Sequence, residues 1–129
     1  MRRALKLDTP VLINELQIDE ANLEGELLQQ PLKMAKISEL TIAAYQRMSL
    51  KELELKEKEA ELAKQFREIN RDNKVTESMV KEFLQTHEEL RRLRRDLIDA
   101  EIEYKLYDSI RYAFVQRAAM LELLIKLRS

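Results

Sequence analysis

The scarcity of glycine and proline is the feature that most constrains this chain. Gly25 is the single glycine among 129 residues, and Pro10 and Pro31 are its two prolines. Globular proteins average roughly 7 % glycine and 5 % proline. A chain so poor in turn-forming residues cannot make the many turns of a β-sandwich, a β-barrel or a doubly wound α/β fold. We therefore expect an all-α protein built from a few long helices.

Missing residue types exclude several kinds of functional site. The chain has no cysteine and a single histidine, His87, which argues against disulfides, thiol nucleophiles, the usual zinc sites and a Ser-His-Asp triad. We expect His87 to lie in the first turn of the last helix. No uncharged stretch approaches the roughly 20 residues of a membrane span. The sequence thus predicts a cytoplasmic protein that is not an enzyme, uses no cofactor or metal, and has no membrane partner.

Positive charge is concentrated in the middle of the chain. The net charge is −1, but residues 64–95 carry nine basic and six acidic side chains, whereas residues 1–63 carry nine basic and twelve acidic ones. A fold that gathers residues 64–95 at one end would be electrically polarised, and such a field attracts an anionic partner.

The first half of the chain predicts an arm followed by a long helix. Residues 1–30 are rich in capping and turn residues, and we expect an irregular arm with a short helix near 22–29. Pro31 is typical of a helix start, because proline is tolerated in the first turn. Nothing breaks a helix between residues 31 and 70. Within it, apolar residues recur every seven positions at Met48, Leu55, Leu62 and Ile69.

An elbow and a second long helix follow. Thr76 is typical of a helix N-cap, and Thr86 to Glu89 fits a capping box. These signals predict an elbow over residues 71–86, with a short helix near 77–85, and then a helix over 87–128. A 3–4 spacing of apolar residues predicts a coiled-coil seam that makes residues 31–129 an antiparallel helical hairpin. The seam consists of Leu90, Leu93, Leu97, Ala100, Tyr104, Tyr107, Arg111, Phe114, Ala118, Leu121 and Ile125.

The C-terminal part of the last helix predicts self-association. Beyond Ala113 the helix is apolar on several faces at once, and a single antiparallel partner helix covers one face only. We therefore expect a homo-oligomer, either a dimeric four-helix bundle or a higher ring. The predicted interface consists of Phe114, Ala118, Met120, Leu121, Leu124 and Ile125.

Nine basic residues around the elbow are the candidate ligands for nucleic acid. Four of them lie within five helical residues, and arginine binds phosphate bidentately. In a hairpin the other five fall at the same end. The alternative is salt bridging, since Glu88, Glu89 and Asp99 lie about one turn away. The nine residues are Lys64, Arg67, Arg71, Lys74, Lys81, Arg91, Arg92, Arg94 and Arg95.

Three further side chains have two interpretations each. Phe66 and Phe83 would stack on bases if the basic region binds single strands, but Phe66 also fits the hydrophobic core, which we favour. Arg111 interrupts the coiled-coil seam. It would pair with Glu52 or Glu54 across the hairpin, or face a central hole in an oligomer, and we favour the pairing.

Two stretches of the chain carry a family resemblance. Gln17 to Pro31 has Ile-Asp, then Asn-Leu, Glu, and Leu and Pro before a long charged helix, and Tyr104 to Ile110 is followed by Arg117 and an apolar tail. Over residues 17–127 the chain resembles the UvsY family, the recombination mediator proteins of T-even-like and related phages. Residues 64–71 depart from the family pattern, because the family's tyrosine pair and glycine are missing there.

The resemblance implies a non-enzymatic assembly factor for DNA recombination and repair. Such a protein forms a ring-like homo-oligomer in the host cytoplasm and binds single-stranded DNA. It helps a RecA-like recombinase displace the single-strand-binding protein and form its filament. Of the family's DNA-binding segment, Lys64, Phe66 and Arg67 match in character. The alternative that the residues leave open is a coiled-coil interaction or scaffold module without nucleic-acid binding, whose arginines are paired on its surface.

Overall fold

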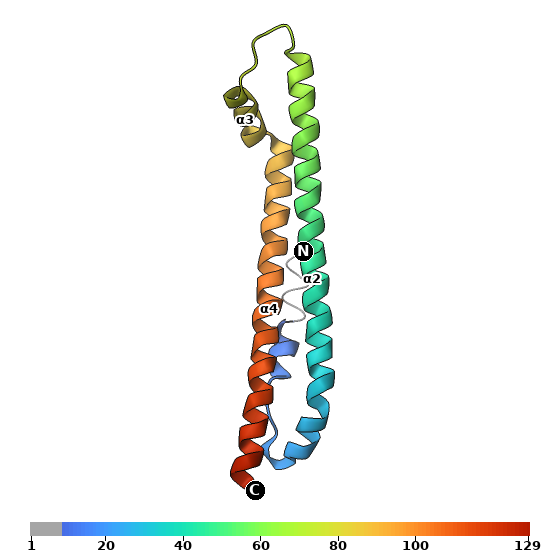
Figure 1. The fold of residues 1–129 in the computed structure, drawn as a ribbon, viewed down its shortest axis with the longest axis vertical. Helices are drawn as coiled ribbons and strands as arrows, with labels where there is room; N and C mark the ends of the chain where they lie inside the picture. Colours follow the sequence, from blue (N-terminus) through green and yellow to red (C-terminus); the bar gives the residue numbers. More distant parts are fainter. Residues whose placement is uncertain (1–8) are drawn as a thin grey trace. The chain divides into compact units, whose positions relative to one another are not determined.

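The computed structural model describes residues 9–129, and this part of the chain contains helices but no strand. A short helical segment at residues 9–14 precedes the 3-10 helix η1 (Glu20–Asn22). The three main helices are α2 (Leu23–Ile69), α3 (Glu77–Thr86) and α4 (Glu88–Arg128). Segments of α2 and α4 pack against each other in opposite directions (Figure 1). The predicted all-α helical hairpin is therefore confirmed.

The chain divides into two compact units. Unit 1 comprises Met1–Tyr45 and Ile102–Ser129, and unit 2 comprises Gln46–Glu101. Each unit thus contains a stretch of α2 and a stretch of α4, while unit 2 also contains α3. Across the described residues, no helix is both long enough and apolar enough to cross a membrane.

The start of α2 differs from the prediction. The helix begins at Leu23 and contains Pro31, rather than beginning at Pro31. Local capping explains the earlier start, because the Asn22 side chain accepts a hydrogen bond from the Gly25 N–H at 3.2 Å. A proline inside a helix lacks one backbone donor and costs about 3 kcal/mol. The turn before Pro31 is tied to α4 by polar contacts of Gln30, which offset that cost.

The core of unit 1 lies between α2, α4 and the N-terminal segment. The sequence predicts an irregular arm here, but residues 9–14 are helical and their Leu12 is 2 % exposed. Hydrophobic burial therefore holds this segment, although residues 1–8 of the predicted arm lie outside the described residues. The buried cluster consists of Leu12, Ile37, Ala44, Tyr107, Ile110 and Phe114.

The core of unit 2 is smaller. Leu62, Leu90 and Leu93 are buried together, with Leu55, Phe83 and Leu84 packed against them. The cluster joins the end of α2 to α3 and to the first turns of α4, so it fixes the geometry of the elbow.

The caps of the elbow agree with the sequence at one end and differ at the other. Thr76 is the N-cap of α3, since its side chain accepts from the Met79 N–H at 3.2 Å. The predicted capping box at Thr86 is wrong. The Thr86 hydroxyl donates back to the Glu82 carbonyl at 3.0 Å, so it belongs to the end of α3. His87 separates the two helices, and α4 begins at Glu88.

Candidate nucleic-acid interface

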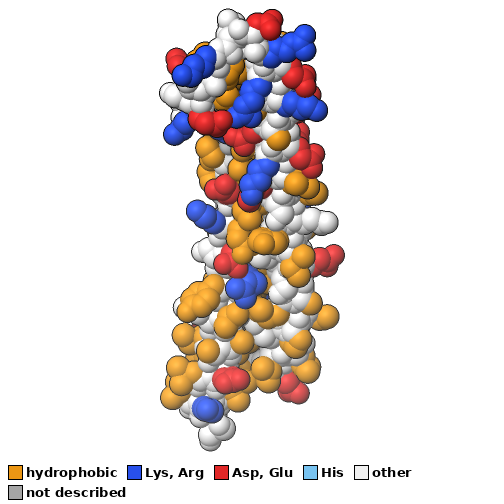
Figure 2. All heavy atoms as spheres, turned by 45° about the horizontal axis from the view of Figure 1, so that its top comes forward, with side chains coloured by type: hydrophobic (Ala, Val, Ile, Leu, Met, Phe, Trp, Pro, Cys, Tyr) orange, Lys and Arg blue, Asp and Glu red, His pale blue; other side chains and the backbone are white. Residues whose placement is uncertain are grey.

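All nine predicted basic residues lie in unit 2. Lys64 and Arg67 are in the last turns of α2, Lys81 is on α3, and Arg71 and Lys74 are in the connection between these helices. The four arginines lie between the fourth and the eighth residue of α4. Contacts between the elements gather these segments, because Phe66 stacks on Phe83 and Arg94 reaches the Leu84 carbonyl. Figure 2 shows Lys and Arg side chains intermingled with Asp and Glu at the top of the view, where α3 lies.

Two of the nine basic side chains are held by the protein itself. The Arg94 guanidinium donates to the Leu84 carbonyl at 3.2 Å and lies 3.7 Å from the Glu59 carboxylate. It therefore ties the end of α3 and the facing part of α2 to α4. Arg67 pairs with Glu77 at 2.8 Å, and both side chains are largely exposed. Arg94 is consequently a structural residue, whereas the Arg67 pair is open to competition by a ligand.

The other seven basic side chains are exposed and form no ion pair with any described residue. The alternative, in which these arginines pair with Glu88 or Glu89, is not seen among the described residues. Glu89 instead lies 3.5 Å from Lys58 of α2. Seven cationic groups are thus left facing solvent in unit 2. They are Lys64, Arg71, Lys74, Lys81, Arg91, Arg92 and Arg95.

Acidic side chains dilute this positive charge. Glu68, Asp72, Glu82 and Glu88 are exposed on the same elements. An anionic ligand must therefore contact individual cations at close range, since opposite charges nearby weaken the long-range field. The arrangement suits a chain of phosphates, whose charges can each approach a separate side chain.

The aromatic residues of the elbow belong to the packing. Phe66 stacks on Phe83 with ring centroids 4.6 Å apart. Phe83 in turn packs against the buried leucines and meets the edge of the His87 ring at 5.5 Å. The core interpretation of Phe66 is thereby favoured over base stacking. The Nδ1 atom of His87 is buried without a hydrogen-bond partner among the described residues.

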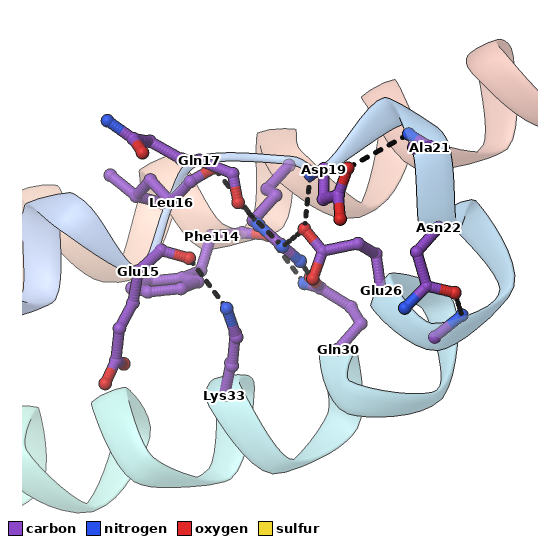
Figure 3. A network of polar contacts seen from close by, with 12 residues as sticks. Glu15, Leu16, Gln17, Asp19, Ala21, Asn22, Glu26, Gln30, Lys33 and Phe114 are labelled. Atoms are coloured by element: carbon purple, nitrogen blue, oxygen red, sulfur yellow. Dashed lines mark hydrogen bonds and ion pairs between the residues drawn. The ribbon is translucent and has the colours of Figure 1, made fainter.

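A buried polar network in unit 1 was not predicted from the sequence. Arg117 is 4 % exposed and joins α4 to the N-terminal segment and α2. Figure 3 labels the residues that surround this network, among them Leu16, Gln17, Glu26 and Gln30. Its guanidinium donates to the Leu16 and Gln17 carbonyls, both at 3.1 Å, and to the Gln30 side chain at 2.6 Å. It also pairs with Glu26 at 2.8 Å. The i,i+4 spacing of Glu26 and Gln30 was the available signal, since it places both on one helix face.

The electrostatics of this network favour an ionised Glu26. The backbone N–H of Asp19 donates to the carboxylate at 2.9 Å and lowers the pKa of Glu26 below its ordinary value. The nearby charges of Arg117 and Lys33 lower this pKa further, against the opposing effect of burial. The network therefore fixes residues 16–19 to α4. We call these contacts of Arg117 with Leu16, Gln17, Glu26 and Gln30 the clamp.

The predicted oligomer interface divides into buried and accessible residues. Phe114 and Leu121 are 0 % exposed within a single chain, so they leave a second copy nothing to contact. Phe114 belongs to the buried cluster of unit 1, which explains its burial. Ala118, Leu124 and Ile125 are half-buried, and Met120 is exposed.

The outer face of α4 in unit 1 carries a second apolar stripe. At about 100° per residue its members fall within a sector of roughly 80°, approximately opposite Tyr107 and Phe114. Their exposed fractions run from 48 % to 74 %. This stripe was not separated from the inner seam in the sequence. It consists of Ile102, Tyr112, Met120, Leu123 and Leu127.

Arg111 has a different partner from the one predicted. Its Nε atom lies 3.0 Å from Asp108, one turn earlier on the same helix. The predicted pairing with Glu52 or Glu54 across the hairpin is therefore wrong. An i,i+3 pair satisfies the guanidinium locally, and this removes the need for a cross-helix carboxylate.

Comparison with known proteins gives no relative. No protein-family model, no curated protein and no solved structure matches the chain significantly. Functional inference therefore rests on the residues and on their geometry.

Proposed function

We propose that this protein is a non-enzymatic single-stranded-DNA-binding recombination mediator, which assists a RecA-like recombinase in displacing the single-strand-binding protein. The observation that carries the proposal is the set of seven exposed, unpaired cations on the converging elements of unit 2. Arginine and lysine side chains of this kind supply the phosphate contacts on which nucleic-acid binding depends. The UvsY-like stretches point to the recombination role.

Self-association is part of the proposal. The exposed stripe on the outer face of α4 provides apolar side chains within one sector of the helix, and Met120, Leu123 and Leu127 follow the 3–4 spacing of a coiled coil. A second copy of the chain would cover them. Repetition of a modest basic site in an oligomer raises the overall affinity, because every contact after the first is intramolecular. We therefore expect unit 1 to mediate assembly and unit 2 to bind DNA.

DNA binding is tested by fluorescence anisotropy of a labelled single-stranded oligonucleotide. The double variant R91E/R95E should weaken binding at least tenfold at low salt. The matched control is K105E/K126E, which changes the net charge equally but at two exposed lysines of unit 1. It should change the affinity by no more than about twofold. Equal effects of the two variants would remove the proposed site.

Arg94 is unsuitable for the binding test. Because it holds the Leu84 carbonyl, its reversal would disturb the α3–α4 junction and confuse loss of binding with loss of structure. Circular dichroism of R91E/R95E should match the wild type, since neither side chain has a partner among the described residues.

The recombination role needs a separate assay. The protein should shorten the lag before a RecA-like recombinase hydrolyses ATP on DNA coated with single-strand-binding protein. R91E/R95E should not shorten this lag, which should stay as long as it is without added protein. A wild-type protein that binds DNA but does not affect the lag would contradict the mediator role while leaving the DNA site intact.

Self-association is tested by sedimentation velocity. L123E/L127E introduces charges into the outer stripe and should reduce the sedimenting mass while helicity is retained. A wild-type chain that is monomeric at all concentrations would contradict the assembly part of the proposal.

A coiled-coil scaffold module without nucleic-acid binding is the second candidate. The acidic residues interspersed with the basic ones favour it, and so does the Arg67–Glu77 pair. It predicts no anisotropy change with DNA at any salt concentration. The same titration therefore separates the two candidates.

A further inference from the structure

The aromatic side chains of unit 2 determine what a bound nucleic acid can contact. Binders of single strands commonly stack bases on exposed aromatic rings beside a basic groove. Phe66 and Phe83 are the phenyl rings of residues 46–101, which contain no Tyr or Trp. These two rings stack on each other at 4.6 Å with an interplanar angle of 26°. One face of each ring is therefore already covered.

The remaining surface of Phe83 is also engaged. Phe83 packs against the buried leucines of unit 2, and the edge of His87 meets it at an interplanar angle of 73°. Both phenylalanines and His87 are only partly exposed. A base inserted between these rings would have to separate contacts that hold the elbow together.

The cations show the opposite arrangement. Seven of the nine basic side chains are exposed and have no ion-pair partner among the described residues, and Arg67 is held only by a largely exposed carboxylate. These basic side chains extend from α2, the α2–α3 connection, α3 and α4. Their charges are therefore distributed over a surface and are not confined to one narrow groove. Such a surface matches the phosphodiester backbone and is indifferent to the bases.

We propose that unit 2 recognises nucleic acid by its phosphates alone and makes no stacking contact with the bases. This inference rests on the proposed DNA binding and specifies the chemical class of the ligand, a flexible chain of phosphates. Base composition then has no influence on affinity. Inorganic polyphosphate competes for the same side chains.

The decisive probe is a single strand without bases. A labelled deoxythymidine oligonucleotide is compared with an abasic strand of the same length, in which tetrahydrofuran sugars replace the nucleosides. The two dissociation constants should agree within about twofold. Loss of a single base–aromatic stack weakens binding about fivefold or more. A fivefold or larger loss on the abasic strand would therefore overturn the inference.

Salt dependence provides a second, independent readout. The slope of log K against log salt is about −0.7 per phosphate contact for single strands. Seven unpaired cations contribute at most about −5 to the slope for each protein chain that contacts the strand, and the normal and abasic strands should give the same slope. A shallower slope for the abasic strand would also count against phosphate-only recognition.

Substitution of the rings gives a third test. Phe66→Leu removes an aromatic face but keeps an apolar side chain in the packing, and its affinity for the deoxythymidine strand should stay within twofold of the wild type. A selective loss of binding in a variant with normal circular dichroism would show base stacking. If the variant fails to fold, the abasic comparison on the wild-type protein still decides.

The outcomes separate this inference from the proposed function. Binding to the normal strand with a large loss on the abasic strand overturns phosphate-only recognition and leaves DNA binding standing. If the protein binds neither strand and does not bind polyphosphate, both the inference and the proposed DNA binding are overturned. Equal binding that polyphosphate competes away supports both.

Discussion

Units 1 and 2 are built from stretches of the same two helices, yet they differ in what they bury and expose. In unit 2, 27 of the 56 residues are charged, against 20 of 73 in unit 1. Of the large apolar side chains that are exposed within residues 9–129, thirteen belong to unit 1 and five to unit 2. A long amphipathic helix can thus change its surface along its length while its inner seam continues.

The interiors differ in the same direction. Unit 1 has six residues in its buried cluster and a clamp built on Arg117, whereas unit 2 has three. A larger core stabilises more, because burial of apolar area is the main favourable term in folding. We therefore expect unit 1 to contribute most of the stability of the fold, and unit 2 to tolerate changes at its surface.

The largest expected effect comes from the core of unit 1. Phe114→Ala should lower the free energy of unfolding by about 3–5 kcal/mol, since the ring is fully buried. Phe83→Ala in unit 2 should cost roughly half as much, because that ring is only partly buried. Urea denaturation followed by circular dichroism measures both. Equal losses would break the comparison between the two cores.

The clamp of unit 1 should be sensitive to pH. Glu26→Gln should cost roughly 1.5–3 kcal/mol at pH 7, the range for hydrogen bonds to charged groups. The pKa of Glu26 is lowered in the folded chain, so its contribution is fully present above the ordinary value of 4.5. It is lost as the pH falls through the lowered pKa.

The measurement for the clamp is urea denaturation of wild type and variant between pH 3 and pH 7. The difference in unfolding free energy should shrink in acid. Glu24→Gln is the matched control, because Glu24 is exposed on the same helix. It should differ from the wild type by less than about 0.5 kcal/mol throughout. A difference for Glu26→Gln that stays constant with pH would contradict the clamp.

Two neighbouring arginines sharpen the distinction between structural and free cations. Arg94→Ala should cost about 1–2 kcal/mol, because it loses the bond to the Leu84 carbonyl and the Glu59 pair. Arg95→Ala should stay within about 0.5 kcal/mol of the wild type. Thermal unfolding measures both. A reversal of this order would mean that the assignment of the two residues is wrong.

The smallest predicted effect concerns the elbow. Thr76→Ala removes the N-cap of α3 and should cost about 1 kcal/mol. Thr76→Ser keeps the hydroxyl and should be nearly neutral. The same denaturation assay applies, and hydrogen exchange should locate the Ala variant's loss of protection in α3. Similar losses in both variants would show that the cap does not stabilise this helix.

Local signals predicted the elbow well and tertiary contacts poorly. The cap at Thr76 and the 3–4 spacing from Leu90 depend on nearby residues, and they gave α3 and α4 to within two residues. The start of α2 was misplaced by eight residues. The turn before Pro31 is held by Gln30 and Glu26 through Arg117, about 90 residues away in sequence.

The candidate site divides in the same way. The sequence identified all nine basic residues of unit 2, because charge can be read from composition. It did not distinguish Arg94 from its neighbours, since that depends on the position of the Leu84 carbonyl. Burial of Phe114 likewise depends on its partners in the unit 1 cluster, among them Leu12 and Ile37, so sequence periodicity alone did not separate the buried residues from the exposed stripe.

The central claim is that unit 2, and not unit 1, binds the phosphate chain. Lysine footprinting tests it most directly: the protein is acetylated briefly with and without a saturating single-stranded oligonucleotide, and modification of each lysine is quantified by mass spectrometry. DNA should protect Lys64, Lys74 and Lys81 from acetylation, while Lys105 and Lys126 should react equally with and without DNA. Protection of Lys105 and Lys126 with unchanged reactivity in unit 2 would contradict this claim.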